Sequence, residues 1–227
     1  MPNGTLYLLS VPIGNLQDIS LRALEVLRRV SLLIVEDTRV TKKLLSHYEI
    51  ECPLHRYDTR RLEQSLALLR QTLEEGKEVA LVSDAGTPTI ADPGNRAVQE
   101  ALRLGAKVTA IPGASAVLTA LVLSGMAHGR FAFDGFPPTS ATDRHVFFFQ
   151  LSTETRTIVL YETASRLRNT LCTLAQHLGE ERSLLIAKDL TKPTETLLYT
   201  TLGIACASIS RRLQKGEYAL VIAGKTP

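Results

Sequence analysis

Short apolar runs separated by amphipathic stretches dominate the first half of the chain. The runs show no polar alternation, as expected of parallel strands that are covered on both faces. They lie at residues 6–9, 32–35, 79–82 and 108–111. Between them, leucines recur at helical spacing, after Ser20 and again from Leu62 to Leu73, where the pattern stops before Gly76. The alternation predicts a doubly wound parallel sheet with right-handed crossovers.

The second half alternates strand and helix patterns again. Strands are predicted at residues 158–161, 184–187, 196–199 and 218–223, and helices at 114–123, 167–178 and 202–213. Residues 135–142 are rich in turn formers, and we place an interdomain loop near them. The order predicts an α/β protein of two α/β domains: an N-terminal domain at 1–120 and a smaller mixed-sheet domain at 121–227.

Composition narrows the class of protein. The 227 residues carry a net charge of +3, and no apolar run reaches the ~18 residues of a membrane helix. The N-terminus lacks the features of a secretory signal, so we expect a cytoplasmic protein with no membrane partner. Cys52, Cys172 and Cys206 are far apart and odd in number, which argues against disulfides and zinc and favours plain thiols. The five histidines show no metal-ligand spacing.

Loops rich in glycine and proline follow three of the predicted strands, at residues 10–15, 83–94 and 111–116. Gly86 and Gly94 allow positive φ, while Pro88 and Pro93 fix φ and remove donors. Because parallel strands end at one edge of a sheet, we expect the three loops to converge on one crevice. The alternative is that glycine and proline only make tight strand-to-helix turns here.

The sequences of the loops also narrow the class of ligand that they can bind. None reads Gly-x-Gly-x-x-Gly or Gly-x-x-x-x-Gly-Lys-Ser/Thr, which disfavours a pyrophosphate ligand. Exposed backbone amides, small side chains and the carboxylate of Asp84 suit a zwitterionic adenosine-containing ligand, and S-adenosyl-L-methionine is the natural candidate. We expect Gly86→Val to abolish its binding and leave the fold intact.

Seven motifs occur in an order that resembles a known family. They include Pro-Ile-Gly-Asn within 11–19, Glu-Asp-Thr-Arg at 36–39, and the segments 83–88, 92–94, 111–116, 161–162 and 190–192. The sequence resembles, over nearly its whole length, the small-subunit ribosomal RNA methyltransferases that 2′-O-methylate a cytidine of 16S rRNA, within the tetrapyrrole methylase superfamily. The resemblance implies S-adenosylmethionine bound in a cleft between two α/β domains, a homodimer, and the small ribosomal subunit as partner.

The resemblance assigns six residues to the cofactor: Asp84, Ala85, Gly86, Ile90, Ser115 and Ala116. Pro12 and Gly14 line the same crevice, and Tyr161 and Ala219 of the second domain are predicted to close over the adenosine. Our RNA-contact candidates are Arg39, Lys42, Lys43 and Lys188, since an RNA strand needs its phosphates neutralised.

Proton transfer from the ribose hydroxyl calls for a carboxylate at a strand end. Asp37 is the first choice, and its alternative role is to cap the helix starting near Thr38 or to pair with Arg39. Glu162 is the second choice, and its alternative role is a modest surface pair with Arg166 one turn later.

The sequence departs from the family pattern in three places. Residues 137–145 offer only Arg144 and His145 where relatives usually carry several Lys and Arg. Lys188 and Asp189 replace the usual Arg-Glu, and the sequence ends at Pro227, so we expect no RNA contact from a C-terminal extension. Two other functions stay open: methylation of a small tetrapyrrole-type molecule, which the Glu-Asp-Thr-Arg motif disfavours, and RNA or cofactor binding without catalysis.

Overall fold

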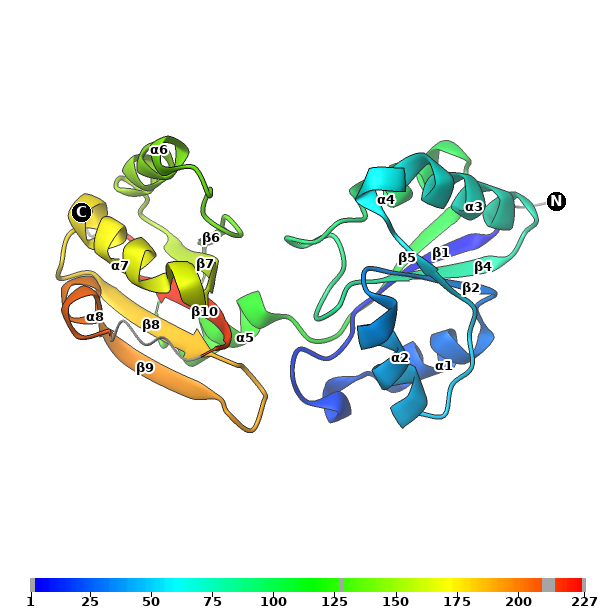
Figure 1. Cartoon of the computed structure of the whole chain (residues 1–227), viewed down its shortest axis with the longest axis horizontal. Helices are drawn as coiled ribbons and strands as arrows, with labels where there is room; N and C mark the ends of the chain where they lie inside the picture. The colour runs from blue at the N-terminus through cyan, green and yellow to red at the C-terminus, as the bar shows by residue number, and fades with distance from the viewer. Residues whose placement is uncertain (1–2, 127–128, 210–214, 226–227) are drawn as a thin grey trace. The chain divides into compact units, whose positions relative to one another are not determined.

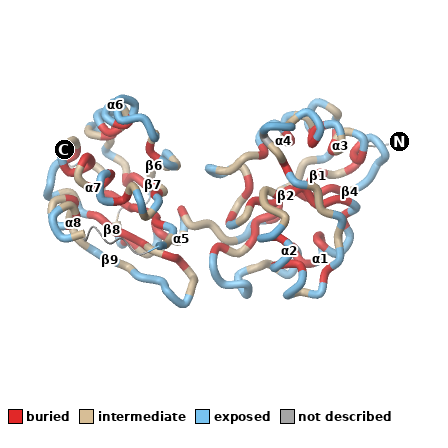
Figure 2. The backbone as a smooth tube through the Cα atoms, viewed as in Figure 1, coloured by how far each residue is buried: buried red, intermediate tan, exposed pale blue. Residues whose placement is uncertain are grey.

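Each apolar run that predicts a strand forms one in the computed structural model, which describes residues 3–126, 129–209 and 215–225. The chain divides into two compact units, unit 1 (Met1–Ser115) and unit 2 (Ala116–Pro227). In both units the inner strands of the sheet are buried, and exposed residues lie mainly in loops, helices and edge strands (Figure 2).

Unit 1, the blue to green part of Figure 1, is built on a parallel sheet with the strand order β3-β2-β4-β1-β5. Its strands are β1 (Thr5–Leu9), β2 (Leu32–Val35), β3 (Leu54–Arg56), β4 (Glu78–Val82) and β5 (Lys107–Ile111). The helices between them are α1 (Leu21–Arg29), α2 (Thr38–His47), α3 (Leu62–Glu74) and α4 (Asn95–Arg103), with short 3-10 turns η1 (Leu16–Asp18) and η2 (Thr59–Arg61). All carboxyl ends of these strands therefore lie at one edge of the sheet.

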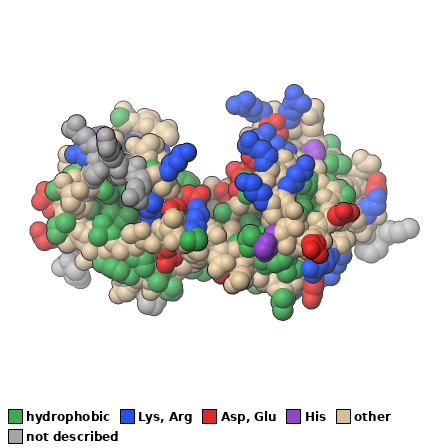
Figure 3. Space-filling view, turned by 60° about the horizontal axis from the view of Figure 1, so that its bottom comes forward, with side chains coloured by type: hydrophobic (Ala, Val, Ile, Leu, Met, Phe, Trp, Pro, Cys, Tyr) green, Lys and Arg blue, Asp and Glu red, His purple; other side chains and the backbone are tan. Residues whose placement is uncertain are grey.

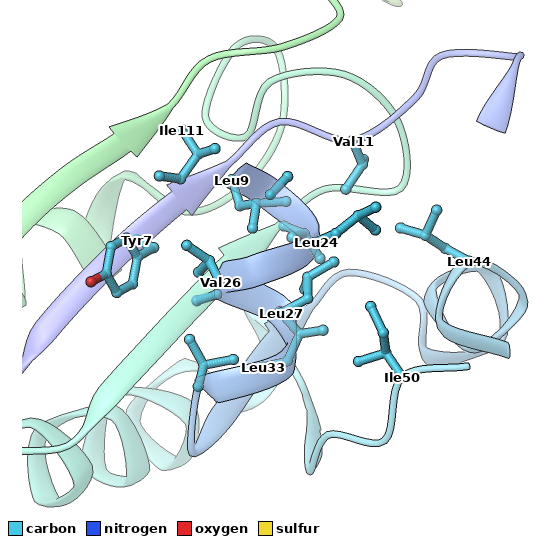
Figure 4. Close-up of a cluster of buried hydrophobic side chains, with 14 of the residues drawn as sticks. Tyr7, Leu9, Val11, Leu24, Val26, Leu27, Leu33, Leu44, Ile50 and Ile111 are labelled. Carbon is cyan, nitrogen blue, oxygen red and sulfur yellow. The ribbon is translucent and has the colours of Figure 1, made fainter. Parts of the chain in front are cut away.

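Both faces of this sheet are covered, because alternate strand residues point to opposite sides. On one face, Leu33 and Val35 of β2 pack with the apolar sides of α1 and α2 (Figure 4). On the other face, Leu32 and Ile34 pack with α3 and α4. The Ser20 hydroxyl caps α1 by accepting the Ala23 N–H at 3.1 Å. The predicted doubly wound sheet is confirmed.

Unit 2 contains a mixed sheet with the strand order β6-β7-β10-β8-β9. Its strands are β6 (Phe131–Phe133), β7 (Thr157–Thr163), β8 (Ser183–Lys188), β9 (Thr196–Thr201) and β10 (Glu217–Ile222). Its helices are α5 (Ala116–Leu123), α6 (Ala141–Leu151), α7 (Ala164–Leu178) and α8 (Leu202–Ser208). Among the strands of the described residues, β6 and β7 pair in parallel, and the other ladders of this sheet are antiparallel. The mixed sheet matches the prediction, and α6, α7 and α8 bury one of its faces.

Three expectations for unit 2 need correction or closer bounds. The predicted interdomain loop at 135–142 is wrong, because this segment joins β6 to α6 inside unit 2. Residue 120, where the sequence places the domain boundary, lies within α5, which packs on β7 and β10. The helix predicted at 202–213 is described only as α8, and residues 210–214 lie outside the described part of the chain.

The expectation that all three cysteines are plain thiols is also wrong. Cys172 of α7 and Cys206 of α8 form a disulfide, with their Cα atoms 4.8 Å apart. They are 34 residues apart in sequence, and only the packing of α7 against α8 brings them within bonding distance. Cys52 is a free, half-buried thiol whose pKa is raised by burial.

Candidate functional site

Three loops of unit 1 meet beyond the carboxyl ends of β4, β1 and β5, which are neighbours in the sheet. Val11 and Gly86 exchange two backbone hydrogen bonds, of 2.9 and 3.0 Å. The hydroxyls of Ser10 and Thr87 lie 3.0 Å apart, and Thr87 donates to the Ala114 carbonyl at 3.3 Å. The convergence that parallel topology predicts is therefore confirmed by direct contacts between the loops.

Gly86 stands at the centre of this junction. Its φ is +74°, and a Cβ added to it would lie 3.3 Å from Ile13 Cγ2 and 3.7 Å from the Ala114 carbonyl oxygen. A valine there would strain the backbone and press on both neighbouring loops. Gly86→Val therefore tests the fold together with the site, which corrects the expectation that the fold would stay intact.

The loop between β4 and α4 holds further residues in the left-handed region. Thr89 has φ of 72° and Ala91 has φ of 63°, although neither is a glycine. Between them, Ile90 is 45% exposed, unusually open for an isoleucine. Such backbone conformations persist only where the surrounding structure enforces them, and they gather at binding sites. The loop thus presents an apolar side chain to solvent at the position predicted to contact the cofactor.

The other cofactor candidates lie around the same junction. Gly14 and Ala85 are exposed, while Pro12, Asp84 and Ser115 are half-buried. Ser115 is the last residue of unit 1, and Ala116 opens α5 as the first residue of unit 2. Seven of the predicted cofactor residues, from Pro12 to Ser115, are thus brought to one edge of one sheet.

Carboxylates gather at this edge, beside the three loops. Glu36 and Asp37 follow β2, Asp84 follows β4, and Asp92 lies in the β4–α4 loop. Asp84 Oδ1 accepts the Asp37 N–H at 2.9 Å. The pKa values of Glu36, Asp84 and Asp92 are all raised, first by burial and then by the negative charge of their acidic neighbours. Such mutual repulsion favours a cationic ligand or protonation of the cluster.

Asp37 performs both of the structural roles weighed for it. It caps α2 by accepting the Arg39 N–H at 2.8 Å, and its carboxylate pairs with the Arg39 guanidinium at 2.6 Å. These hydrogen bonds lower the pKa of Asp37 to about 2. Asp37 is therefore ionised at neutral pH, and it is a weak base that can accept a proton only from a strongly activated hydroxyl.

The RNA-contact candidates fall into two environments. Lys42 and Lys43 are exposed on α2 in unit 1, next to the exposed guanidinium of Arg39. In Figure 3, Lys and Arg side chains gather on one side of the unit that holds the N-terminus, with carboxylates among them. Lys188 is different: its side chain in unit 2 is only 13% exposed and lies 3.4 Å from Asp189. Lys188 therefore has little surface to offer a nucleic acid.

Glu162 of β7 is fully buried in unit 2, where it is the centre of a polar network. Arg166 lies 2.9 Å from one carboxylate oxygen, Arg144 lies 3.8 Å from the other, and the Thr170 hydroxyl donates to it. The alternative of a pair with Arg166 is confirmed, although the pair is buried rather than superficial. Arg144, one of the two basic residues in segment 137–145, is 5% exposed and is engaged here.

Tyr161 and Ala219 face each other across the β7–β10 ladder of unit 2. Ala219 is 3% exposed, whereas Tyr161 is half-buried and packs edge-on against Phe133, with ring centroids 5.0 Å apart. Phe136, 47% exposed, lies 5.5 Å from the Tyr161 ring. No local pattern in the sequence points to this aromatic group, because Tyr161 of β7 joins Phe133 and Phe136 only through the pairing of β6 with β7. The contact of Tyr161 and Ala219 with adenosine stays a prediction.

Metal ligation receives no support within the described residues, where no group of three or more His, Cys, Asp or Glu side chains is arranged to hold an ion. The site therefore consists of converging backbone loops, an acidic strand edge and exposed basic residues on α2.

Comparison with known proteins decides the family. Residues 5–205 match the family model of the tetrapyrrole (corrin/porphyrin) methylases. The chain belongs to the tetrapyrrole methylase family. Within it, the chain is 45% identical to the ribosomal RNA small subunit methyltransferase I of Synechocystis, over 99% of this chain and 80% of that protein. It is 38% identical to the methyltransferase of the same name from Thermotoga maritima, over 98% of this chain and 99% of that protein.

Two solved structures of more distant proteins share the fold. A diphthine synthase superposes with a TM-score of 0.74 at 20% identity, over 98% of this chain and 90% of its own. A uroporphyrin-III-C-methyltransferase from Thermus thermophilus gives a TM-score of 0.64 at 20% identity, over 97% of this chain and 92% of its own. At these identities the likeness supports the two-unit α/β fold alone, and membership of the methyltransferase family rests on the sequence relatives.

Proposed function

We propose that this tetrapyrrole methylase transfers a methyl group from S-adenosyl-L-methionine to the ribose 2′-oxygen of a cytidine in 16S rRNA of the small ribosomal subunit. Relatives 38–45% identical over nearly the whole chain carry the name ribosomal RNA small subunit methyltransferase I. The structural observation that supports the proposal best is the junction of the three loops, through Ser10, Thr87 and Ala114, beside the acidic edge of unit 1.

The residues at this edge fit the proposed methyl donor. S-adenosylmethionine carries a positive sulfonium and a positive ammonium group, and it supplies the methyl group from the sulfonium. Asp84 and Glu36, whose pKa values are raised by burial and by like charges, would gain from a cation placed beside them. Pro12, Gly14, Ala85, Gly86, Ile90, Ser115 and Ala116 are proposed to surround the rest of the molecule.

Methyl transfer to a hydroxyl depends mainly on alignment of the two reacting atoms and on exclusion of water. We assign Asp37 to the acceptance of the ribose proton or to the orientation of the hydroxyl, because it is ionised and lies beside Asp84. Glu162 is less suited to either task, since Arg144, Arg166 and Thr170 occupy its buried carboxylate. Its contacts favour a structural role in unit 2.

The proposed substrate locates the protein with ribosomes in the cytoplasm, where we expect it to act as a homodimer. None of the helices in the described residues is long and apolar enough to cross a bilayer. Light scattering of the purified protein would measure its mass in solution, and a mass of one chain would contradict the dimer.

The test is transfer of radiolabel from S-adenosylmethionine to small ribosomal subunits that lack the modification, followed by nuclease digestion and mass spectrometry. Label on one cytidine 2′-oxygen is the expected result. Label on a tetrapyrrole substrate but not on RNA would favour a small-molecule methyltransferase. Binding of the methyl donor without transfer to either substrate would favour a non-enzymatic protein.

A further inference from the structure

A pocket with a volume of about 370 Å³ opens at the carboxyl edge of β2 and β3, beside the acidic edge described above. The volume lies within the range of small-ligand sites. Its lining comes from the ends of β2 and β3, from η2 and from the β4–α4 loop: Glu36, Arg56, Tyr57, Asp58, Arg60 and Pro93. Glu36 therefore belongs both to the pocket and to the acidic cluster proposed to face the methyl donor.

Two arginines supply the positive charge of this pocket. Arg56 and Arg60 are exposed, and neither forms an ion pair with a carboxylate of the described residues. Arg56 donates its Nε–H to the Glu36 carbonyl at 3.3 Å, which ties the guanidinium to the end of β2. By contrast, Arg39 and Arg70 pair with carboxylates at 2.6 and 2.7 Å. The charge of Arg56 acts on the carboxylates of Asp37 and Asp84, but it forms no ion pair with either. Two guanidinium groups outside ion-pair distance of a carboxylate at one pocket favour an anion, and their fork geometry suits phosphate.

The acidic members of the lining do not cancel this preference. Asp58 Oδ1 accepts the Arg60 N–H at 2.9 Å and so caps η2, which fixes the backbone on which Arg60 stands. Glu36 accepts a hydrogen bond from the Asp84 backbone, and its pKa is raised by burial and by Asp84 and Asp92. A carboxyl group at the pocket wall can also accept a hydrogen bond from a sugar hydroxyl. The lining thus combines phosphate donors with a hydroxyl acceptor, as an RNA backbone requires.

We propose that Arg56 and Arg60 bind a backbone phosphate of the RNA strand next to the nucleotide that is methylated, with Glu36 against the adjoining ribose. The inference rests on the proposed function, because it takes the strand to be the substrate. The pocket would be a second RNA-contact site, in addition to the exposed lysines of α2. The α2 residues offer charge alone, whereas the pocket offers a shaped position for one phosphate. Such a contact fixes the register of the strand at the methyl donor.

The test compares Arg56→Ala, Arg60→Ala and the double variant with Arg28→Ala. Arg28 is also an exposed arginine. It lies in the last turn of α1, which leads into the start of β2, and therefore lies at the opposite edge of the sheet. Each protein is assayed for methyl transfer to unmodified small subunits, for binding of S-adenosylmethionine by calorimetry, and for binding of a single-stranded RNA oligonucleotide at several salt concentrations. Thermal unfolding checks that each variant is folded.

For the double variant we expect a KM for the subunit raised about tenfold, an unchanged affinity for S-adenosylmethionine, and a log–log salt slope of RNA binding reduced by about 0.7, because the contact with one phosphate is lost. Arg28→Ala should match the wild type. Arg56→Lys with Arg60→Lys should keep most of the salt slope and lose part of the affinity, since lysine keeps the charge but not the fork. A DNA oligonucleotide of the same sequence should bind more weakly than the RNA.

An unchanged KM and salt slope in the double variant, with an active wild type, would overturn the inference and leave the proposed function standing. Equal affinity for DNA and RNA would show that Glu36 does not contact the ribose hydroxyl, and would overturn that part of the inference. A wild type that binds S-adenosylmethionine but methylates no RNA would overturn the proposed function and the inference together.

Discussion

Both units carry carboxylates at the ends of strands, but the groups that surround these carboxylates differ. In unit 1, Glu36 and Asp84 face other carboxylates, and their pKa values are raised by burial and repulsion. In unit 2, Glu162 is enclosed by two arginines and a threonine, and Asp189 lies near Lys188 and Lys192. Similar positions at a strand end thus serve two purposes: a carboxylate that faces other carboxylates is available to a ligand, and one that is paired with arginine or lysine holds the fold together.

Topology explains the difference. Every strand of the unit 1 sheet runs in the same direction, so its carboxyl-end loops all emerge at one edge and bring backbone and acidic groups together. In unit 2 the antiparallel ladders divide the strand ends between two edges. A polar group there finds its partners within the unit, as Glu162 does in α6 and α7. The comparison predicts that substitutions of the unit 1 carboxylates will impair ligand binding or catalysis with little loss of stability, whereas substitution of Glu162 in unit 2 will lower stability.

The largest effect on stability is expected from Glu162→Ala. The change leaves Arg144, which is 6% exposed at its side chain, without its carboxylate, and removal of one partner from a buried ion pair costs about 3–5 kcal/mol. Chemical denaturation measures the free energy of unfolding. A cost below about 1 kcal/mol, the value of a surface pair, would show that the network is not a structural element of unit 2.

Asp37→Asn is expected to change the rate and not the fold. The pair with Arg39 is at the surface and screened by solvent, so its loss should leave the free energy of unfolding unchanged within experimental error. Loss of the proton acceptor should lower kcat for methyl transfer about 100-fold. Steady-state kinetics with unmodified subunits measures this change, and an unchanged kcat would remove Asp37 from the reaction.

Asp84→Asn tests whether the acidic edge faces a cation. We expect the affinity for S-adenosylmethionine to fall about tenfold, or ~1.4 kcal/mol, by calorimetry. The free energy of unfolding should change by less than about 0.5 kcal/mol, because the substitution relieves repulsion around a half-buried carboxylate. Full affinity in this variant would place the ligand away from Asp84.

The smallest effect is a pH dependence of binding. Since the pKa values of Glu36, Asp84 and Asp92 are raised, these groups take up protons at a higher pH than ordinary carboxylates do. A cation favours their ionised forms, so binding of S-adenosylmethionine should release protons and weaken as the pH falls. Asp37, with a pKa of about 2, contributes nothing to this dependence. Calorimetry in buffers of different ionisation enthalpy counts the protons, and proton uptake on binding would contradict the account.

The fold was largely predictable, because parallel strands covered on both faces leave unbroken apolar runs. Three elements escaped the pattern: β3, the three-residue strand β6, and α6. β3 is short, only partly buried and contains His55 and Arg56, so it shows no apolar run. In α6 the three phenylalanines 147–149 are consecutive, and only Phe148 is buried, which gives no helical period.

The candidate site was predictable as far as local sequence and sheet direction determine it. The meeting of the three loops follows from parallel topology, and the cap and pair of Asp37 involve neighbours within two residues. The burial of Arg144 depends on Glu162 in another element, and the disulfide depends on the packing of α7 against α8. The pocket of Arg56 and Arg60 depends on the turn that Asp58 caps. Contacts between distant elements leave no local pattern in a sequence.

The most direct test of the central claim is a crystal structure of the protein with S-adenosylhomocysteine, the demethylated product of the proposed donor. We predict contacts from the ligand to the backbone of residues 84–86 and to Ser115, with its sulfur on the side of Asp84. A ligand that touches none of the three loops of unit 1 would contradict the claim that the parallel sheet edge holds the methyl donor.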